Sequence, residues 1–161
     1  MIYEFKEYDG VNQTPAIPLI ARAWQELLAR GISPMETIGN WDHQAVVAFS
    51  GDMPVGVMTY THEKWKKVLW VHLGFVVPEL RRHGIYKLLW ERVVKAAQKL
   101  GAAEIQGSTH VDNSAMLECA RKLGRTRLFI TTRFVVPPAI VSSIPKPVPP
   151  RGRLIKERDA R

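Results

Sequence analysis

The sequence predicts an α/β (α+β) fold in which a mixed, mostly antiparallel sheet carries helices on both faces. Patterns along the chain run in the order strand, helix, hairpin, strand, helix, strand, helix, strand. The strand–helix–strand segment over residues 67–110 is expected to form a parallel pair with a right-handed crossover. The earlier strands are close in sequence and are expected to pair antiparallel. With 161 residues, 46% of them apolar, the chain is long enough for one domain with its own core.

The first half of the chain predicts a strand, a helix and a hairpin. Residues 2–8, "IYEFKEY", alternate as a strand does. Thr14 followed by Pro15 is typical of a helix start, with threonine as the N-cap and proline at the first helical position. Residues 45–61 contain two β-rich runs on either side of Gly51-Asp52, which indicates a hairpin with its turn at this dipeptide.

The second half predicts further strands and helices. In order, they are a nearly all-apolar strand at 67–77, a helix at 85–100, a short strand at 103–111, another helix, and a last strand or strand pair at 125–136. Gly74 inside the first of these strands indicates a bulge or a close backbone approach. Asp112 or Asn113 is expected to cap the second helix and Gly124 to end it.

Charge is spread unevenly along the chain, whose net charge is +8. Residues 1–80 carry 6 Lys/Arg and 9 Asp/Glu, whereas residues 81–161 carry 17 and 6. A basic half of this kind favours a polyanionic partner, which could be nucleic acid, a phosphorylated cofactor or an acidic protein. A solvated basic surface is the plain alternative.

Location and the C-terminal tail are predicted from composition. No apolar run approaches the ~20 residues of a membrane span, and no secretory signal pattern is present, so no membrane association is expected. Cys119 has no cysteine to pair with in this chain, which favours a cytoplasmic location. Five scattered histidines show no metal-ligand spacing. Residues 137–161 form a separate Pro-rich basic tail, either lying along the domain or a partner subunit of a homodimer, or disordered.

The turn after the apolar strand, "RRHGIY", has the properties of an anion site. The first N–H groups of a helix lack intrahelical partners, and the helix dipole favours negative charge there. Gly84 lets the backbone approach a ligand, and Arg81, Arg82 and His83 add donors and positive charge. The spacing is neither that of a Walker A loop nor that of a Rossmann glycine fingerprint.

"FVVPELRRHGIYKLL" resembles the acetyl-CoA motif of the GNAT N-acetyltransferase superfamily, Val-x-Pro-x-x-Arg/Gln-x-x-Gly-x-Gly/Ala. Val76, Pro78, Arg81 and Gly84 match, whereas Tyr86 stands at the last Gly/Ala position. "NSAMLECARKLG", which begins at Asn113, resembles the second block of the family. The resemblance covers residues 1–136 and implies an acetyl-CoA-dependent N-acetyltransferase that acts by direct transfer on a small-molecule or protein amine.

The resemblance also implies where acetyl-CoA binds. The pyrophosphate would lie on backbone amides of the turn, the pantetheine arm would pair with the end of the apolar strand where two parallel strands splay, and the Asn would meet the arm from the other side. The cofactor-binding residues so implied are Phe75, Val76, Val77, Arg81, Arg82, His83, Gly84, Ile85, Tyr86 and Asn113. A plain N-cap is the alternative role for Asn113.

Catalysis by direct transfer needs a base for the amine proton and an acid for the departing thiolate. The acidic residue and the tyrosine that members often use would fall at Ser108 and Ala120, so neither is present. His72 is expected to face the same side of its strand as Gly74 and Val76, and it matches the catalytic histidine of arylalkylamine-type members. A histidine that only packs in an apolar strand is the alternative.

Two other functions remain open at this stage. A GNAT-like modifier associated with nucleic acid would explain the basic second half. A catalytically silent domain would use the proline tail as a contact arm. The acceptor pocket is expected in the loop over residues 31–44, with Trp41, and near Trp65, and Tyr86 is expected to pack on the sheet rather than to replace the missing proton donor.

Overall fold

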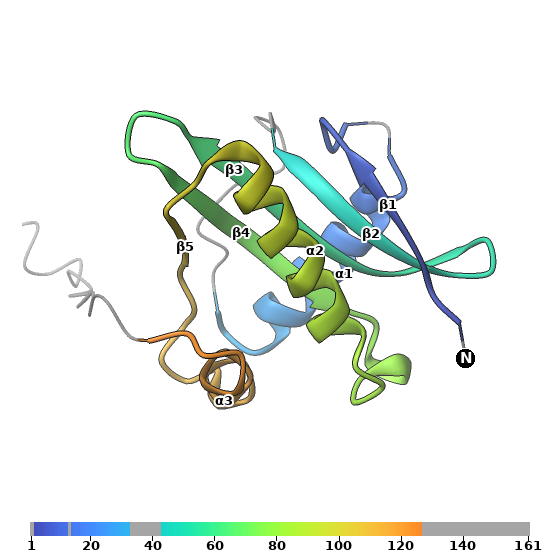
Figure 1. Ribbon diagram of the computed structural model, residues 1–161. Helices are drawn as coiled ribbons and strands as arrows, with labels where there is room; N and C mark the ends of the chain where they lie inside the picture. Colours follow the sequence, from blue (N-terminus) through green and yellow to red (C-terminus); the bar gives the residue numbers. More distant parts are fainter. Residues whose placement is uncertain (1, 13, 33–42, 127–161) are drawn as a thin grey trace, which may run out of the picture. The chain divides into compact units, whose positions relative to one another are not determined.

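The computed structural model describes residues 2–12, 14–32 and 43–126 (Figure 1). The chain divides into two units, residues 1–126 and 127–161, and the second unit lies outside the described residues. Most of the predicted last strand, the proline-rich tail and most of the 31–44 loop therefore lie outside them as well. The elements are, in chain order, β1 (Glu4–Tyr8), α1 (Ala16–Ala29), β2 (Gln44–Ser50), β3 (Met53–Glu63), β4 (Val68–Val76), the short 3-10 helix η1 (Pro78–Leu80), α2 (Ile85–Leu100), β5 (Glu104–Gly107) and α3 (Ser114–Lys122).

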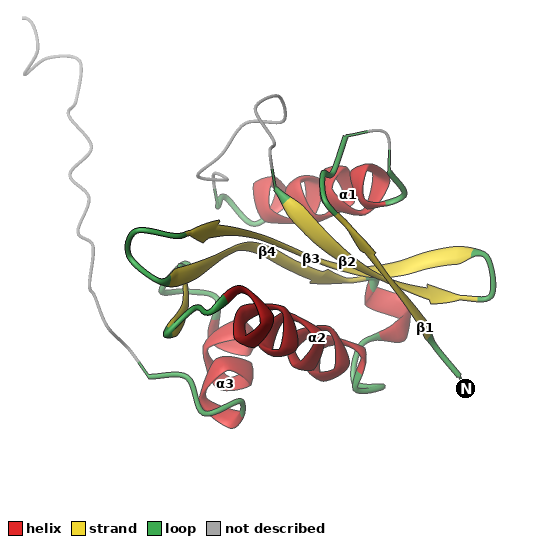
Figure 2. Ribbon diagram, turned by 45° about the horizontal axis from the view of Figure 1, so that its top comes forward, coloured by secondary structure: helices red, strands yellow, loops and turns green. Residues whose placement is uncertain are grey.

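The strands form one mixed sheet in the order β1-β2-β3-β4-β5. Neighbouring strands are antiparallel except for β4 and β5, which are parallel and are joined by the α2 crossover. Helix α1 covers one face of the sheet and α2 covers the other, as Figure 2 shows. The predicted fold class, a mostly antiparallel sheet with helices on both faces, is confirmed.

Local chemistry explains where the first elements begin and end. The turn between β2 and β3 falls at Gly51, whose φ of 59° is one that glycine adopts without strain. Helix α1 begins one residue later than the pattern predicts, with Pro15 at the cap position. Thr14 still serves the helix start, because its Oγ1 accepts the N–H of Ala16 at 3.3 Å.

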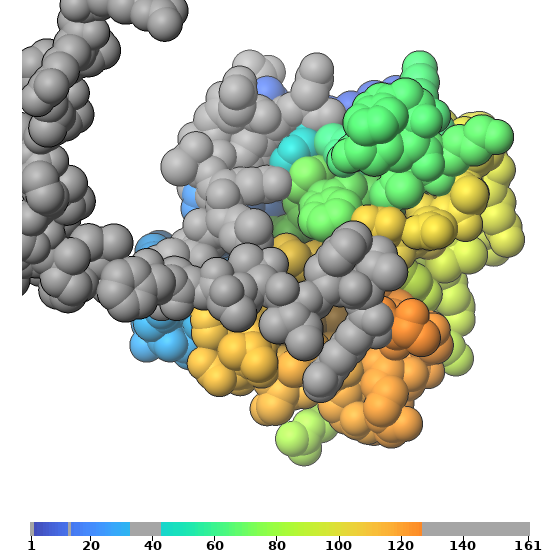
Figure 3. All heavy atoms as spheres, turned by 90° about the vertical axis from the view of Figure 1, so that its left-hand side faces the viewer, coloured from blue at the N-terminus to red at the C-terminus, as the bar shows by residue number. Residues whose placement is uncertain are grey.

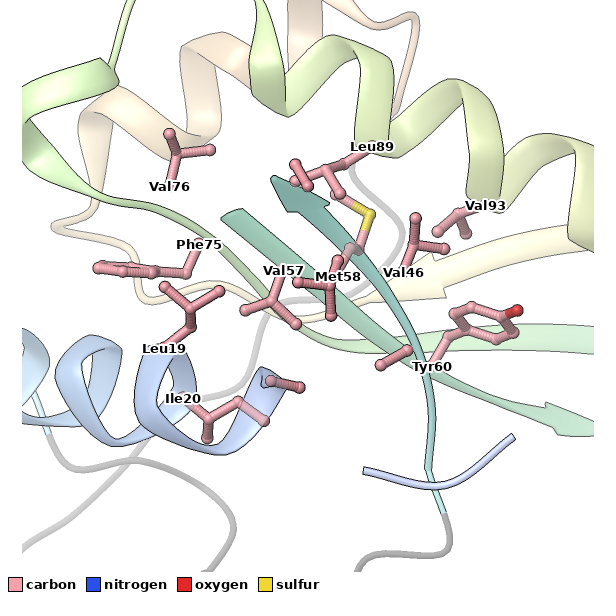
Figure 4. Close-up of a cluster of buried hydrophobic side chains, with 14 of the residues drawn as sticks. Leu19, Ile20, Val46, Val57, Met58, Tyr60, Phe75, Val76, Leu89 and Val93 are labelled. Atoms are coloured by element: carbon pink, nitrogen blue, oxygen red, sulfur yellow. The ribbon is translucent and has the colours of Figure 1, made fainter. Parts of the chain in front are cut away.

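The core forms two layers, one on each face of the sheet. Val57 and Phe75 lie on the α1 face with Leu19, whereas Met58 lies on the α2 face with Leu89 (Figure 4). Neighbouring residues of β3 thus serve opposite layers, as the two-residue period of a strand requires. This alternation makes it possible to decide on which face each site residue lies.

A bulge in β4 changes that alternation in the middle of the strand. Thr59 of β3 pairs with Leu73, but the next residue, Tyr60, pairs with Val71. His72 is therefore the extra residue. Before it, even-numbered residues of β4 lie on one face of the sheet, and after it they lie on the other face. The glycine at position 74 did indicate an irregular strand, but the bulge itself lies two residues earlier.

Pairing between β4 and β5 is short. It runs from Val68–Glu104 to Val71–Gly107 and stops there, while β4 continues to Val76. Among the described strands, the end of β4 beyond Val71 therefore has β3 on one side and no partner on the other, and we call this side its open edge. This is the splayed parallel pair expected from the resemblance.

None of the helices in the described part of the chain is long and apolar enough to cross a membrane.

Candidate functional site

The open edge of β4 presents backbone groups to the gap beside β5. The N–H of Val77 donates to the carbonyl of Val55 on β3 at 3.0 Å. Because peptide groups alternate in direction along a strand, those of Val76 and Gly74 point to the gap instead. Phe75, which the resemblance assigns to the cofactor arm together with Val76, directs its own backbone to β3. The side chains of Phe75, Val76 and Val77 are buried.

Beyond β4 the chain makes a turn whose backbone is bent twice into the left-handed region. Arg82 has φ 68° and Gly84 has φ 80°, and α2 then begins at Ile85. Within the described residues the N–H groups of residues 82–87 have no hydrogen-bond partner, and the first bond of α2 runs from Leu88 N–H to the Gly84 carbonyl at 3.1 Å. No side chain caps this helix start and no acidic residue lies in its first turn. Such a run of unpaired amides at a helix dipole favours an anion.

Arg81 holds this turn in place. Its Nε donates to the carbonyl of Val76 at 3.0 Å, and its guanidinium donates to both carboxylate oxygens of Glu26 on α1, at 3.0 and 2.6 Å. The hydrogen bond from Arg81 holds the pKa of the Glu26 carboxyl below its usual value. Since its guanidinium donates to α1 and β4, Arg81 supports the turn.

The next two side chains of the turn remain available. Arg82 and His83 are both exposed. The Nδ1–H of His83 donates to the carbonyl of Arg81 at 3.0 Å, which fixes the ring beside the turn. Arg82 has no ion-pair or hydrogen-bond partner among the described side chains, so its charge can serve a ligand at the helix start.

Tyr86 packs on the sheet with the outer end of its ring over Gly74. A Cβ built on Gly74 would come within 2.7 Å of Cε2 and 2.8 Å of the hydroxyl of Tyr86, so position 74 has room for the ring only because it is glycine. The expectation that Tyr86 packs on the sheet is confirmed. Burial raises the pKa of Tyr86 to about 12, although the nearby charge of Arg125 acts in the opposite direction. The ring therefore lies at the open edge as a neutral phenol at ordinary pH.

His72 is held on the other face of the sheet. Its Nε2 lies 2.8 Å from Oγ1 of Thr61, and its ring stacks on His43 with centroids 3.8 Å apart and planes 9° from parallel. Thr61 lies four positions after Val57 on β3 and therefore on the same face of the sheet, the α1 face, whereas Gly74 lies on the α2 face. The prediction that His72 shares a side with Gly74 and Val76 is therefore wrong, because the bulge at His72 breaks the alternation on which it rested.

His43 is a site residue that the sequence interpretation missed. It stands directly before β2 and is buried. The only signal in the sequence was its position, since a residue before β2 comes opposite the end of β3 in an antiparallel pair.

Asn113 caps α3, as predicted. Its Oδ1 accepts the N–H of Met116 at 3.4 Å, and its Nδ2 lies 3.5 Å from Oγ1 of Thr109. Ser108 is exposed just past the end of β5, and Ala120 is half-buried in α3. Neither can serve as an acid or base. Among the described residues no group of three or more His, Cys, Asp or Glu side chains could hold a metal ion.

Comparisons with known structures agree with this geometry. The aminoglycoside N-acetyltransferase AAC(6')-Iy, in complex with the bisubstrate analogue CoA-S-monomethyl-acetylneamine, is 15% identical and matches with a TM-score of 0.64 over 85% of this chain and 99% of that chain. An aminoglycoside acetyltransferase from an uncultured soil metagenomic sample, in complex with sisomicin, is 15% identical with a TM-score of 0.62 over 84% and 95%. The ribosomal-protein-alanine N-acetyltransferase of Brucella melitensis biovar Abortus 2308 is 13% identical with a TM-score of 0.61 over 84% and 99%. At these identities the likeness is one of fold.

A sequence-family model identifies the family, although a search of curated proteins does not. The sequence has no match among curated proteins. A model of the acetyltransferase (GNAT) family, however, matches residues 14–124, which run from the start of α1 to the end of α3. Because this match spans most of the chain, and the splayed strands and the uncapped helix start lie inside it, the chain belongs to the acetyltransferase (GNAT) family, whose enzymes use acetyl-CoA.

Proposed function

We propose that this chain transfers the acetyl group of acetyl-CoA directly to an amine, with the reaction centred on the gap between β4 and β5. The observation that supports this most is the run of amides at residues 82–87, which have no partner among the described residues and lie directly beside the open edge of β4. An anionic group and an extended amide-containing arm can then be bound by one continuous stretch of backbone.

The residues of the turn fit the pyrophosphate of CoA. Among the described residues the amides of residues 82–87 have no partner, Arg82 adds exposed donors, and no carboxylate in the first turn opposes a negative charge. An anion at a helix N-terminus typically gains about 0.3–1 kcal/mol, and more where the site is partly buried. Val76 offers its N–H to the arm, while its carbonyl is already used by Arg81.

Acetyl-CoA supplies the activated thioester, and this chain's residues have to handle protons. The attacking amine must lose one, and His72 is the proposed base because its ring is fixed by Thr61 and by the stack on His43. Tyr86 packs over Gly74 and keeps its proton, because burial raises its pKa to about 12, so the departing thiolate takes its proton from solvent. Neither Ser108 nor Ala120 provides an acid or a base.

Calorimetry with CoA and acetyl-CoA tests the binding step. We expect saturable binding that Arg82→Ala weakens several-fold, because an exposed charge-assisted contact is lost. Arg92→Ala is the matched control, since Arg92 lies on α2, the helix that follows the turn, and its guanidinium stacks over Phe5. Absence of binding by the unaltered chain at high micromolar CoA would exclude the proposal.

Turnover tests the base. Free thiol released from acetyl-CoA is measured with polyamines, arylalkylamines, peptides and aminoglycosides as acceptors, the last because similar folds are seen with sisomicin. His72→Gln should lower kcat at least tenfold without changing the Kd for CoA. An unchanged rate in His72→Gln would remove this residue from the mechanism.

A further inference from the structure

The connection between β3 and β4 carries an exposed tryptophan among lysines. We call residues Glu63–Lys67, "EKWKK", the β3–β4 tip. Trp65 is 82% exposed, although large aromatic side chains are usually well buried. The Nζ of Lys66 lies 4.5 Å from the centre of the indole ring, so one face of the ring is covered by a cation and the other remains open.

Backbone hydrogen bonds define the conformation of the tip. The N–H of Lys66 donates to the carbonyl of Glu63 at 3.1 Å, and the N–H of Lys67 donates to that of Lys64 at 3.2 Å. Lys67 has φ 55°, a left-handed conformation that costs a non-glycine residue free energy. Its carbonyl accepts the N–H groups at the start of β5, from Ala103 at 2.6 Å and Glu104 at 3.3 Å. The indole is therefore presented on a fixed support.

Further lysines lie on the tip and on the end of α2, which the chain joins to the tip through the Lys67–Ala103 hydrogen bond. The exposed lysines on the tip and on the last turns of α2, which lead into Ala103, are Lys64, Lys66, Lys67, Lys95 and Lys99. In the described part of the chain only Lys66 of this set has an acidic partner, Glu63, and the carboxylate of Glu104 accepts the side-chain amide of Gln106. Figure 3 shows the tip, in green, standing out from the surface beside the yellow end of α2.

The chemistry of this surface selects one class of partner. A flat, open aromatic face can stack on a nucleobase, and cations a few residues away can meet the neighbouring phosphates. A membrane anchor would need several further apolar side chains here, but of the other large hydrophobic side chains exposed in the described residues only Leu100, 36% exposed, lies at the end of α2, and none lies on the tip. An acidic peptide would use the lysines and leave the ring without a role.

We propose that the β3–β4 tip and the end of α2 bind single-stranded nucleic acid, with Trp65 as the stacking platform. This inference does not depend on acetyl transfer. The charge distribution favours a polyanionic partner for the second half of the sequence, residues 81–161; the proposed surface combines the end of α2 from that half with the tip from the acidic first half.

Fluorescence anisotropy of labelled 12-nucleotide oligomers with the full chain tests the proposal. RNA and DNA of the same sequence are compared, because both offer bases and phosphates and only the 2′-hydroxyl differs. Stacking of one base is worth roughly 1–3 kcal/mol, so Trp65→Ala should weaken binding by about 5- to 150-fold. Lys64→Ala with Lys67→Ala should lower the slope of log K against log salt by about 1.4.

The controls separate the tip from the rest of the chain. Met53→Ala removes an equally prominent apolar side chain, 68% exposed, from the opposite hairpin end and should change nothing. Residues 127–161 stay in every variant, so equal binding by Trp65→Ala and the unaltered chain would overturn the proposal. Binding to phosphatidylserine vesicles without binding to oligomers would overturn it as well. Unchanged CoA binding and melting temperature would show that the variants are folded.

Discussion

Replacement of Gly74 by alanine tests how β4 and α2 fit together. In this chain the small residue lies on the strand and the large one on the helix, since Tyr86 fills the position where the motif has glycine or alanine. A Cβ at residue 74 would stand 2.7 Å from Cε2 of Tyr86, well inside contact distance. The ring would have to move, but it is confined by the sheet below and by its own helix.

The expected magnitude follows from this overlap. Overpacking a well-filled site by one methyl group typically costs 1–3 kcal/mol, and we expect about 2 kcal/mol for Gly74→Ala. Truncation of a large aromatic residue costs roughly 3–5 kcal/mol, and Tyr86→Ala should lie near the lower end because the ring is only partly buried. In the double variant the added methyl group occupies space that the ring has left. The free-energy cost of the double variant should therefore be about 1–2 kcal/mol smaller than the sum of the costs of the two single variants.

Urea unfolding followed by circular dichroism measures these differences as shifts of the midpoint at constant m-value. Gly10→Ala is the matched control, because a Cβ there would meet no atom within 4 Å. If the costs of Gly74→Ala and Tyr86→Ala add without coupling, the complementary fit of these two residues is refuted.

Three further changes have defined outcomes. Gly84→Ala should lower stability by about 1 kcal/mol, seen as a drop of a few degrees in Tm, because alanine at φ 80° is strained, and it should also weaken CoA binding. The pKa of Glu26 is lowered in the folded chain, so the bond to Arg81 stabilises the fold fully above the unfolded-state pKa near ~4.3, and this stabilisation is lost as the pH falls through the folded-state pKa. Glu26→Gln should therefore lower the free energy of unfolding by up to about 1 kcal/mol at pH 7 and make stability depend less on pH in the acid range. Burial raises the pKa of Tyr60 and of Tyr86 to about 12, so phenolate absorbance should show two tyrosines ionising near that pH. The stabilisation that these two neutral side chains provide should be complete below pH ~10 and should disappear as the pH rises from ~10 to ~12.

The fold was predictable because its elements carry strong local signals. Alternation in β1, the Gly51 turn, the apolar run of β4 and the Asn113 cap each depend on residues within a few positions of one another. Element order then restricts the sheet to few topologies, since a strand–helix–strand unit forms a right-handed parallel pair. Where the pairing of β4 with β5 would stop depends on register, which no short segment of sequence determines.

The site was predictable only in its backbone. The motif indicated the turn and the helix start, and both lie where it placed them. The orientations of the side chains depend on contacts between residues far apart in the sequence, which a local pattern does not show. Arg81, for example, bonds to a carboxylate 55 residues earlier in the chain. One extra residue in β4 was enough to move His72 to the other face and next to His43, a neighbour from a different strand. Alternation arguments hold only while the ladder is regular.

The bond between Arg81 and Glu26 makes two remote positions dependent on each other. The arginine belongs to the segment by which the family is recognised, yet in this chain its charge is satisfied by α1. A substitution at position 26 would therefore disturb the turn without touching any group that meets the cofactor. In an alignment of relatives that share this arrangement, positions 26 and 81 should change together, and a lone change at either should mark a chain that holds its turn in another way.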